Sequence, residues 1–288
     1  MSSIKEEDLT NIIPKDGPTI EETLKYLEKY IEDFIVIKMG GSVLSNKDLF
    51  DNLIQDIVIL KKLGLSIFLI HGGGLKISKR LDELNIKSHF INGLRVTGEK
   101  IIDTVEDVLI EFNKEIVSAL KKQSCEAKEI TSKKNNAITV RCENKNLGFV
   151  GTPSQVHKEL LINIVKANEI PVIASLGLDK KNQTFNINAD SVAGSIAKEL
   201  KARRLLILSD VEGVLDKDKK LISEINSDQA KQMIKDEVVS GGMIPKVNNC
   251  LDVAKNGVKA VCIIDGRKKH SILFELLSDK GSGTLIRK

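Results

Sequence analysis

The sequence predicts an α/β fold in which helices cover both faces of a mostly parallel sheet. Short apolar runs rich in β-branched residues alternate along the chain with longer segments whose apolar residues recur at every third or fourth position. The short runs are typical of buried strands and the longer segments of amphipathic helices. Their regular alternation indicates a parallel sheet between helical layers. The 288 residues suffice for one large domain or two lobes.

The composition argues against nucleic acid and membrane as binding partners of this protein. The net charge is +4, from 44 basic and 40 acidic residues, and aromatic residues make up only 3% of the chain. A weak field and few stacking side chains argue against a nucleic-acid partner. The polar N-terminus does not resemble a signal peptide, and no apolar run approaches the ~20 residues of a membrane span. We therefore expect a cytoplasmic protein with no membrane partner.

Neither the cysteines nor the N-terminal residues suggest a special site. The four cysteines fit no CxxC or zinc-site spacing, so we expect reduced thiols and no dedicated metal site. Residues 1–16 are polar and expected to be mobile. A helix is predicted next, from apolar residues at helical spacing: Ile20, Leu24, Leu27, Tyr30 and Ile31. Its apolar face needs a partner, and the sequence favours its own domain over another subunit.

The first predicted strand, 34–37, ends at a lysine and two glycines. Lys38 and the pair Gly40-Gly41 therefore stand at the carboxyl end of a strand, where open α/β sheets bind ligands. Glycines let the main chain approach an anion and offer it N–H groups. On its own the pattern is equally typical of a snorkelling lysine followed by a glycine turn.

A second strand, 67–70, ends in a run of glycines. It follows a helix over 46–64, and glycines 72–74 open another helix over 75–84. Main-chain N–H groups at a helix N-terminus form an anion site, and the alternative is a flexible turn. We interpret His71, just before the glycines, as a structural hydrogen-bonding residue rather than a catalyst.

The middle of the chain carries Arg95 in the loop NGLRVT. Its guanidinium could hold a carboxylate bidentately, although a surface salt bridge is the better explanation of one arginine alone. A long helix is predicted over 99–121, short strands and turns between 125 and 150, and a buried strand over 170–174.

Three polar residues precede a small-residue helix in the C-terminal half: Asn186, Asn188 and Asp190. They form a candidate site beside a strand, although the asparagines could be turn formers and Asp190 only a helix N-cap. Further strands are predicted over 205–208 and 261–264. Between them the segment GGMIPK, with Lys246, opens another helix.

The motifs exclude two familiar nucleotide sites. The sequence GxxxxGK[ST] is absent, and there is no Gly-Lys dipeptide, so P-loop chemistry is excluded. The catalytic-loop and DFG motifs of protein kinases are absent too. What the chain offers is glycine-rich strand ends, two lysines, one arginine and one aspartate. This set suits phosphoryl transfer, in which positioning and charge stabilisation dominate.

Six motifs carry a family resemblance: KMGG, HGGG, NGLRVT, NINAD, LILSDVEGVLD and GGMIPK. They occur in the order of the amino-acid-kinase superfamily, and three of them together resemble the acetylglutamate kinase family, from about Thr23 to the C-terminus. The resemblance implies a three-layer αβα sandwich on an open, mainly parallel sheet, with an extra N-terminal helix. It divides the chain into a tail and helix over 1–31, an acetylglutamate-binding lobe over 32–178 and an ATP-binding lobe over 179–288.

The implied reaction is ATP-dependent phosphorylation of the γ-carboxylate of N-acetyl-L-glutamate, the second step of arginine biosynthesis. No general base is required, because that carboxylate is already ionised at neutral pH. Mg²⁺ would be held by the ATP phosphates. The implied charge-stabilising residues are Lys38 and Lys246, oriented by Asp190.

The resemblance also assigns binding residues. The implied substrate contacts are Gly73, Gly74, Arg95, Asn186 and Asn188. The implied phosphate contacts are Gly40, Gly41 and Gly72. The implied nucleotide contacts are Ser209, Asp210, Val211, Glu212, Gly213, Val214, Leu215, Val238, Val239 and Ser240.

The longest departure from the family pattern is one stretch in the middle of the chain, and two alternative functions stay open. The stretch CEAKEITSKKNNAITV, over 125–140, replaces a glycine-rich segment, and we interpret it as a remodelled hairpin near the substrate lobe. A sister kinase acting on N-acetyl-aminoadipate differs by one methylene, which pockets discriminate weakly. A non-catalytic regulatory protein on the same fold is the other alternative.

Two segments outside the active site resemble those family members that L-arginine inhibits. One is the N-terminal helix with Tyr26, and the other is the run HxxLxExxxxxGxGT, with His270, Glu275, Gly281 and Gly283. Glu275 could hold a guanidinium, although a helix with a glycine C-cap before an edge strand explains part of the run. The resemblance implies feedback inhibition and a hexamer built as a trimer of dimers. The N-terminal helix would swap between dimers, which would cover the apolar face of Leu24 and Leu27.

Overall fold

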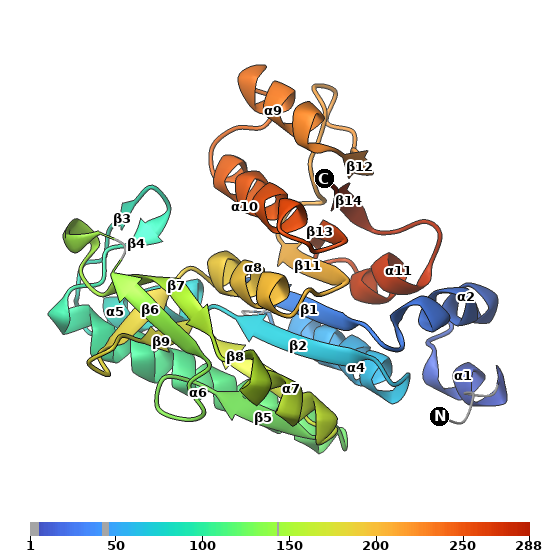
Figure 1. The fold of residues 1–288 in the computed structure, drawn as a ribbon, viewed down its shortest axis with the longest axis horizontal. Coiled ribbons are helices and arrows are strands. Elements are labelled where there is room, and N and C mark those ends of the chain that lie inside the picture. Colours follow the sequence, from blue (N-terminus) through green and yellow to red (C-terminus); the bar gives the residue numbers. More distant parts are fainter. Residues whose placement is uncertain (1–5, 42–45, 143) are drawn as a thin grey trace.

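The computed structural model describes residues 6–41, 46–142 and 144–288, and strands and helices alternate along the chain as predicted (Figure 1). The helices are α1 (Glu6–Ile12), α2 (Ile20–Tyr30), α4 (Lys47–Lys62), α5 (Gly74–Glu83), α6 (Glu99–Lys122), the short 3₁₀ helix η1 (Lys145–Leu147), α7 (Lys158–Lys166), α8 (Ala189–Glu199), α9 (Ser227–Lys235), α10 (Met243–Lys255) and α11 (Ser271–Leu277). The strands are β1 (Phe34–Met39), β2 (Ser66–His71), β3 (Phe90–Ile91), β4 (Leu94–Arg95), β5 (Ala127–Ile130), β6 (Ile138–Cys142), β7 (Val150–Val156), β8 (Ile170–Ala174), β9 (Leu176–Leu178), β10 (Thr184–Ile187), β11 (Arg204–Ser209), β12 (Glu224–Ile225), β13 (Ala260–Asp265) and β14 (Gly283–Ile286).

An eight-stranded sheet forms the centre of the molecule, in the order β12-β14-β13-β11-β1-β2-β8-β5. The strands from β13 to β5 are parallel to one another, and β14 runs antiparallel to β13. The predicted fold class, a three-layer sandwich on a mainly parallel sheet, is confirmed. β1 is central, and it runs through Met39, so Lys38 lies inside the strand rather than after it.

Side chains of the central strands alternate between two hydrophobic cores, one on each face of the sheet. From β1, Ile35 and Ile37 join the core beneath α4, α6 and α11, whereas Val36 joins the core beneath α8 and α10. Successive residues of a strand point to opposite faces, so a continuous apolar run is needed where both faces are buried. This is why the strands read as unbroken aliphatic runs in the sequence.

The N-terminal residues differ from expectation. The expected mobile segment contains α1, whose Leu9 is fully buried, while residues 1–5 lie outside the described part of the chain. Helix α2 is capped by Thr19 and packs against α11 of the same chain. Leu27 is 4% exposed and Leu24 packs against the same core. The apolar face is therefore covered within its own chain, as the sequence favoured, and Leu24 and Leu27 are not left exposed for a second dimer to cover. The swap between dimers stays a proposal.

The divergent segment over 125–140 contributes to two sheets. β5 forms the edge of the main sheet, and β6 pairs antiparallel with β7 in a small sheet of order β10-β7-β6-β9. The interpretation of this segment as a hairpin is wrong, because its two strands pair with different partners in different sheets. β9 and β10 also pair with each other, so this small sheet spans the expected lobe boundary at residue 178. The division into two lobes remains a proposal.

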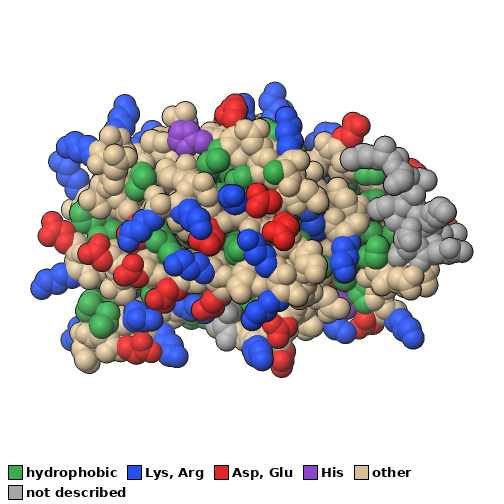
Figure 2. All heavy atoms as spheres, turned by 90° about the horizontal axis from the view of Figure 1, so that it is seen from below, with side chains coloured by type: hydrophobic (Ala, Val, Ile, Leu, Met, Phe, Trp, Pro, Cys, Tyr) green, Lys and Arg blue, Asp and Glu red, His purple; other side chains and the backbone are tan. Residues whose placement is uncertain are grey.

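The surface mixes charges of both signs. Figure 2 shows Lys and Arg side chains interleaved with Asp and Glu on the face seen from below, and several form pairs, such as Lys76 with Glu115 at 2.6 Å. No helix in the described ranges is long and apolar enough to cross a membrane.

Candidate active site

A carboxylate holds two ammonium groups beside the carboxyl ends of the central strands. Lys38 Nζ lies 2.9 Å from Asp190 Oδ1, and Lys246 Nζ lies 2.9 Å from Asp190 Oδ2. Lys38 comes from β1, Asp190 from the first turn of α8 and Lys246 from α10. The structure thus brings together three side chains that are more than 200 residues apart at their extremes in the sequence.

The two lysines decide the ionisation of Asp190. Burial alone would raise the pKa of this carboxyl, but the charges and hydrogen bonds of Lys38 and Lys246 outweigh it and lower the pKa to about 2. The side chain of Asp190 is 17% exposed. The group is therefore a carboxylate at neutral pH, and the cluster carries one net positive charge.

Helix α8 positions Asp190 through its neighbours. Asn188, not Asp190, is the N-cap: its side chain accepts a hydrogen bond from the N–H of Ser191. Asn249 Nδ2, one turn along α10 from Lys246, donates to the main-chain carbonyl of Asp190 at 3.0 Å. The reading of Asp190 as a mere helix cap is therefore wrong.

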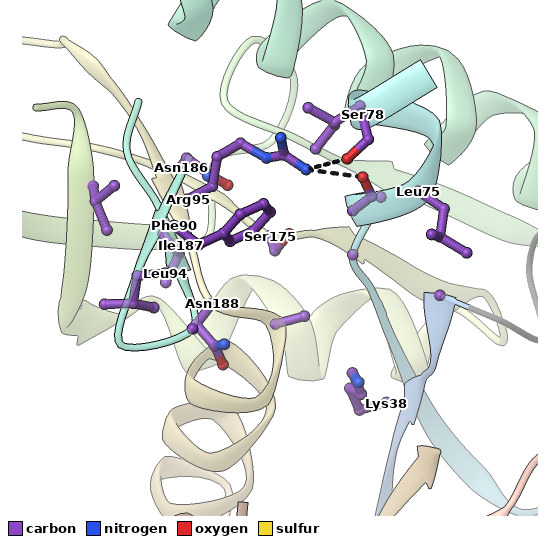
Figure 3. A pocket seen from close by; sticks show the side chains of 18 of the residues that line it. Lys38, Leu75, Ser78, Phe90, Leu94, Arg95, Ser175, Asn186, Ile187 and Asn188 are labelled. Carbon is purple, nitrogen blue, oxygen red and sulfur yellow. Dashed lines mark hydrogen bonds between the residues drawn. The ribbon is translucent and has the colours of Figure 1, made fainter. Parts of the chain in front are cut away.

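A cavity of about 400 Å³ opens next to Lys38. Eight of the expected site residues line it: Lys38, Gly41, Gly72, Gly73, Gly74, Arg95, Asn186 and Asn188. Phe90 and Leu94 of the β3–β4 hairpin, together with Leu75, add apolar wall. In Figure 3 Lys38 and Arg95 lie at well-separated parts of the cavity, so a cation stands at each end.

Arg95 is buried and held by polar groups, not by a surface carboxylate. Its Nη2 donates to Ser78 Oγ at 2.8 Å and to the carbonyl of Gly74 at 3.0 Å (Figure 3), and its Nη1 bonds Ser88 Oγ. The side chain is 6% exposed, and burial lowers the pKa of its guanidinium. The surface salt-bridge explanation of Arg95 is wrong, because its side chain is buried and its guanidinium donates to Ser78, Ser88 and the carbonyl of Gly74.

Asn186 connects to Arg95 through a buried hydroxyl. Its Nδ2 donates to Thr97 Oγ1 at 3.3 Å, and Thr97 Oγ1 donates to the carbonyl of Arg95 at 2.9 Å. Ser78, Ser88, Thr97 and Asn249 were all missed in the sequence. Ser78 and Asn249 lie one helical turn from Gly74 and Lys246, a spacing that could have indicated them. Nothing local indicates Ser88.

The two glycines after Lys38 have different surroundings. A Cβ on Gly40 would lie 2.6 Å from the carbonyl oxygen of Leu208 in β11, so Gly40 is required by close strand packing. A Cβ on Gly41 would meet nothing within 4 Å, and Gly41 lines the cavity. A direct ligand contact is therefore better supported for Gly41 than for Gly40.

The expected nucleotide segments lie outside this cavity. Ser209 ends β11, and the turn after it is held by β14: the N–H of Val214 donates to Thr284 Oγ1 at 2.8 Å. Val214 and Val239 are core residues, whereas Asp210, Glu212 and Ser240 are exposed. Buried Gly213 has a positive φ and sits against Thr284. Val211, Leu215 and Val238 are half-buried.

The residues expected to hold arginine lie at the junction of α2 with the C-terminal segment. Tyr26 Oη donates to Asp279 Oδ1 at 2.6 Å. Glu275 is nearly buried and accepts a hydrogen bond from the N–H of Ser282 at 2.9 Å. Gly281 borders this carboxylate, and a Cβ on Gly283 would overlap the carbonyl of Ile263. The carboxylate is thus partly satisfied by its own loop.

His270 is the N-cap residue of α11. Its Nδ1 is 2.6 Å from Asp56 of α4, and its Nε2 is 3.3 Å from Asp16. The hydrogen bond to Asp56 raises the pKa of His270. Its partners are therefore protein carboxylates, and it does not contact Glu275 in the described hydrogen bonds.

No group of three or more His, Cys, Asp or Glu side chains in the described residues is placed to hold a metal ion.

Comparisons with known proteins agree on one family. Residues 33–265 match the model of the amino acid kinase family. The chain is 69% identical to the acetylglutamate kinase of Pelagibacter ubique, with all of both chains covered, and 39% identical to that of Methylobacterium nodulans, covering 100% of this chain and 99% of the other. The fold is similar to N-acetylglutamate synthase from Neisseria gonorrhoeae, with a TM-score of 0.85 and 23% identity, over 93% of this chain and 62% of that one.

Proposed function

The chain belongs to the acetylglutamate kinases of the amino acid kinase family, and we propose that it transfers the γ-phosphoryl group of ATP to the γ-carboxylate of N-acetyl-L-glutamate. This reaction serves arginine biosynthesis. The observation that carries the proposal is the cluster of Lys38, Asp190 and Lys246 at one end of a cavity that has Arg95 at the other.

The cavity suits a dicarboxylate with an acylated amine. Arg95 receives the α-carboxylate, and its N–H groups that do not bond Ser78, Ser88 or Gly74 remain for that anion. Asn186 and Asn188 contact the rest of the substrate. The γ-carboxylate then points to the glycine run 72–74 and to Lys38.

The lysines act on charge, not on protons. Attack of a carboxylate on ATP brings two anions together, and the transition state spreads negative charge over the transferred group. Lys38 and Lys246 stabilise that charge, while Asp190 holds both ammonium groups in place before the nucleotide arrives. Preorganised charges of this kind cost no reorganisation when the reaction occurs.

ATP is the phosphoryl donor of this kinase, and its site is proposed from position. Segment 209–215 begins at the carboxyl end of β11. Segment 238–240 lies just before α10, the helix that carries Lys246. Mg²⁺ would enter on the ATP phosphates and neutralise part of their charge. Phosphate oxygens would meet the N–H groups of Gly41 and Gly72, with Gly40 supporting the turn.

Trapping of the acyl phosphate tests the function. Purified protein with ATP, Mg²⁺ and N-acetyl-L-glutamate should yield a hydroxamate when hydroxylamine is present. Parallel reactions with N-acetyl-aminoadipate measure chain-length preference. Absence of any hydroxamate would favour a non-catalytic protein, and a higher kcat/KM for the longer acid would make aminoadipate the substrate.

Regulation by L-arginine is a second part of the proposal. Helix α2 and the C-terminal segment are bound to each other, because Asp279 accepts from both Tyr26 and Lys25. Arginine bound at this junction would be held by Glu275 and by main-chain groups near Gly281 and Gly283. The assembly we propose is a hexamer of three dimers in the cytoplasm.

A further inference from the structure

The proposed chemistry leaves one buried titratable residue unused, His71. It ends β2 directly before the glycine run, is fully buried and does not line the cavity. Its ring packs edge-on against Phe112 of α6, with 5.2 Å between centroids. Both ring nitrogens have polar neighbours, so the ring is fixed by specific contacts and not by packing alone.

Those contacts determine the tautomer of His71. Asn113 Nδ2 lies 2.9 Å from the carbonyl oxygen of Val172, and because that oxygen only accepts, the atom must be the amide donor. The same Nδ2 lies 2.9 Å from His71 Nε2, which is therefore the acceptor. The ring proton sits on Nδ1, 3.2 Å from the carbonyl oxygen of Gly72, and donates to it. Burial lowers the pKa of His71 to about 4, which keeps the ring neutral.

This hydrogen bond fixes a peptide unit of the cavity wall. The Gly72–Gly73 peptide bond is trans, and in a planar trans unit the C=O and N–H groups point in opposite directions. A Gly72 carbonyl directed at His71 therefore directs the Gly73 N–H away from His71. Gly72 and Gly73 line the cavity and His71 does not, so that side is the cavity. In the described hydrogen bonds no protein acceptor takes the Gly73 N–H.

We propose that His71 and Asn113 are positioning residues that aim the N–H of Gly73 at an oxygen of the reacting carboxylate. The inference rests on the proposed function for the identity of that oxygen. Without the pair, the two glycines can rotate their shared peptide unit and turn a carbonyl oxygen toward the substrate anion. Hydrogen-bond partners that orient the ligands of a metal ion typically contribute ~10–100-fold to affinity or activity, and we expect an effect of similar size for a pair that orients a main-chain N–H.

The tautomer is tested on the wild-type protein. The ¹⁵N chemical shifts of His71 should show a neutral ring protonated on Nδ1 at pH 7. A neutral ring protonated on Nε2, or a charged ring, would overturn the proposal. This measurement does not depend on catalysis, so it stands even if no acyl phosphate is formed and the proposed function fails.

Kinetics of two variants test the positioning. Asn113→Asp is isosteric, and a protonated carboxyl that donates to Val172 leaves only an acceptor for His71, which moves the ring proton to Nε2. His71→Phe keeps the ring and removes both nitrogens. Each variant should lower kcat ~10–100-fold while KM for ATP stays unchanged.

Phe112→Leu is the matched control. It disturbs packing against the same ring but leaves both hydrogen bonds of His71 intact. It should lower Tm and retain kcat. If Asn113→Asp moves the ring proton without lowering kcat, or if Phe112→Leu lowers kcat as much as His71→Phe, the pair has no positioning role.

Discussion

Lys38 and Lys246 each pair with a different oxygen of Asp190. Each lysine can therefore be replaced without removing the ion pair of the other. Lys246→Ala should lower kcat by ~10²–10³, the usual cost of losing one preorganised charge-stabilising donor, with little change in KM. The control is Lys198→Ala, which breaks a 2.7 Å ion pair with Asp252 between the same two helices, away from the cavity. Equal loss of kcat in both variants would mean that helix packing, not the ammonium of Lys246, is responsible.

Asp190 predicts a dependence of stability on pH. Its folded-state pKa of about 2 lies below the ordinary value of 3.8, so the ionised group stabilises the fold above about pH 4. That contribution is lost as the pH falls through the folded pKa. Asp190→Asn should therefore lower Tm at pH 7, and the difference from wild type should shrink toward pH 2.

The Tm measurement needs a surface control. Asp252→Asn removes an exposed ion pair, which typically contributes only ~0–1 kcal/mol, and should barely change Tm at pH 7. A Tm difference for Asp190→Asn that is the same at pH 7 and in acid would contradict the linkage argument.

Arg95 predicts a change in KM. Its fork already bonds Ser78 and Gly74 on one nitrogen, and a lysine cannot keep those bonds and also hold a carboxylate. Arg95→Lys should raise KM for N-acetyl-L-glutamate more than it lowers kcat. Arg80 is exposed on α5, the helix that carries Gly74 and Ser78, and Arg80→Lys should change neither KM nor kcat. A normal KM with a collapsed kcat would show that Arg95 acts on the reacting group instead.

At the scale of elements, the sequence predicted what depends on local pattern and missed what depends on partners. β8 matches its predicted range, and α6 ends within one residue of it, because aliphatic runs and helical periodicity extend to their ends. α1 was missed, since its burial comes from contact with distant elements. Motifs predicted Lys38, Asp190 and Lys246 as candidate site residues. The hydrogen bond between Arg95 and Ser88 could not be predicted, because it depends on tertiary contact alone.

Close contact between α8 and α10 brings Lys246 to Asp190. A Cβ on Gly194 would lie 2.8 Å from Val253 Cγ2 and 3.2 Å from Asn249 Oδ1, so Gly194→Ala should push the helices apart. We expect lower kcat together with lower Tm. Gly98→Ala, where an added Cβ meets nothing within 4 Å, should leave both unchanged. Full activity of Gly194→Ala would show that the helix spacing tolerates a methyl group.

At the scale of the whole molecule, hydrogen bonds connect helix α2, near the N-terminus, to the segment that follows α11, near the C-terminus. Lys25, Tyr26 and Glu22 of α2 all bond Asp279, which follows α11. Because α11 also packs on β13 and α4, a ligand at this junction could influence the sheet whose other strands carry Lys38 and Ser209. This connection is the physical basis for expecting arginine to act at a distance.

Arginine inhibition and assembly are tested together. The intact protein should be a hexamer by light scattering, and L-arginine should inhibit it. Deleting residues 1–31 should give smaller, less sensitive particles, and because Leu27 and Tyr30 are buried in their own chain, the deletion should also lower Tm. Tyr26→Phe is the cleaner variant, since it removes only the bond to Asp279. It should weaken inhibition while kcat and Tm stay near wild type, and exposed Glu28→Gln should change nothing. A dimeric intact protein would refute the hexamer, and activity that arginine leaves unchanged would refute the regulation, while the kinase assignment would stand.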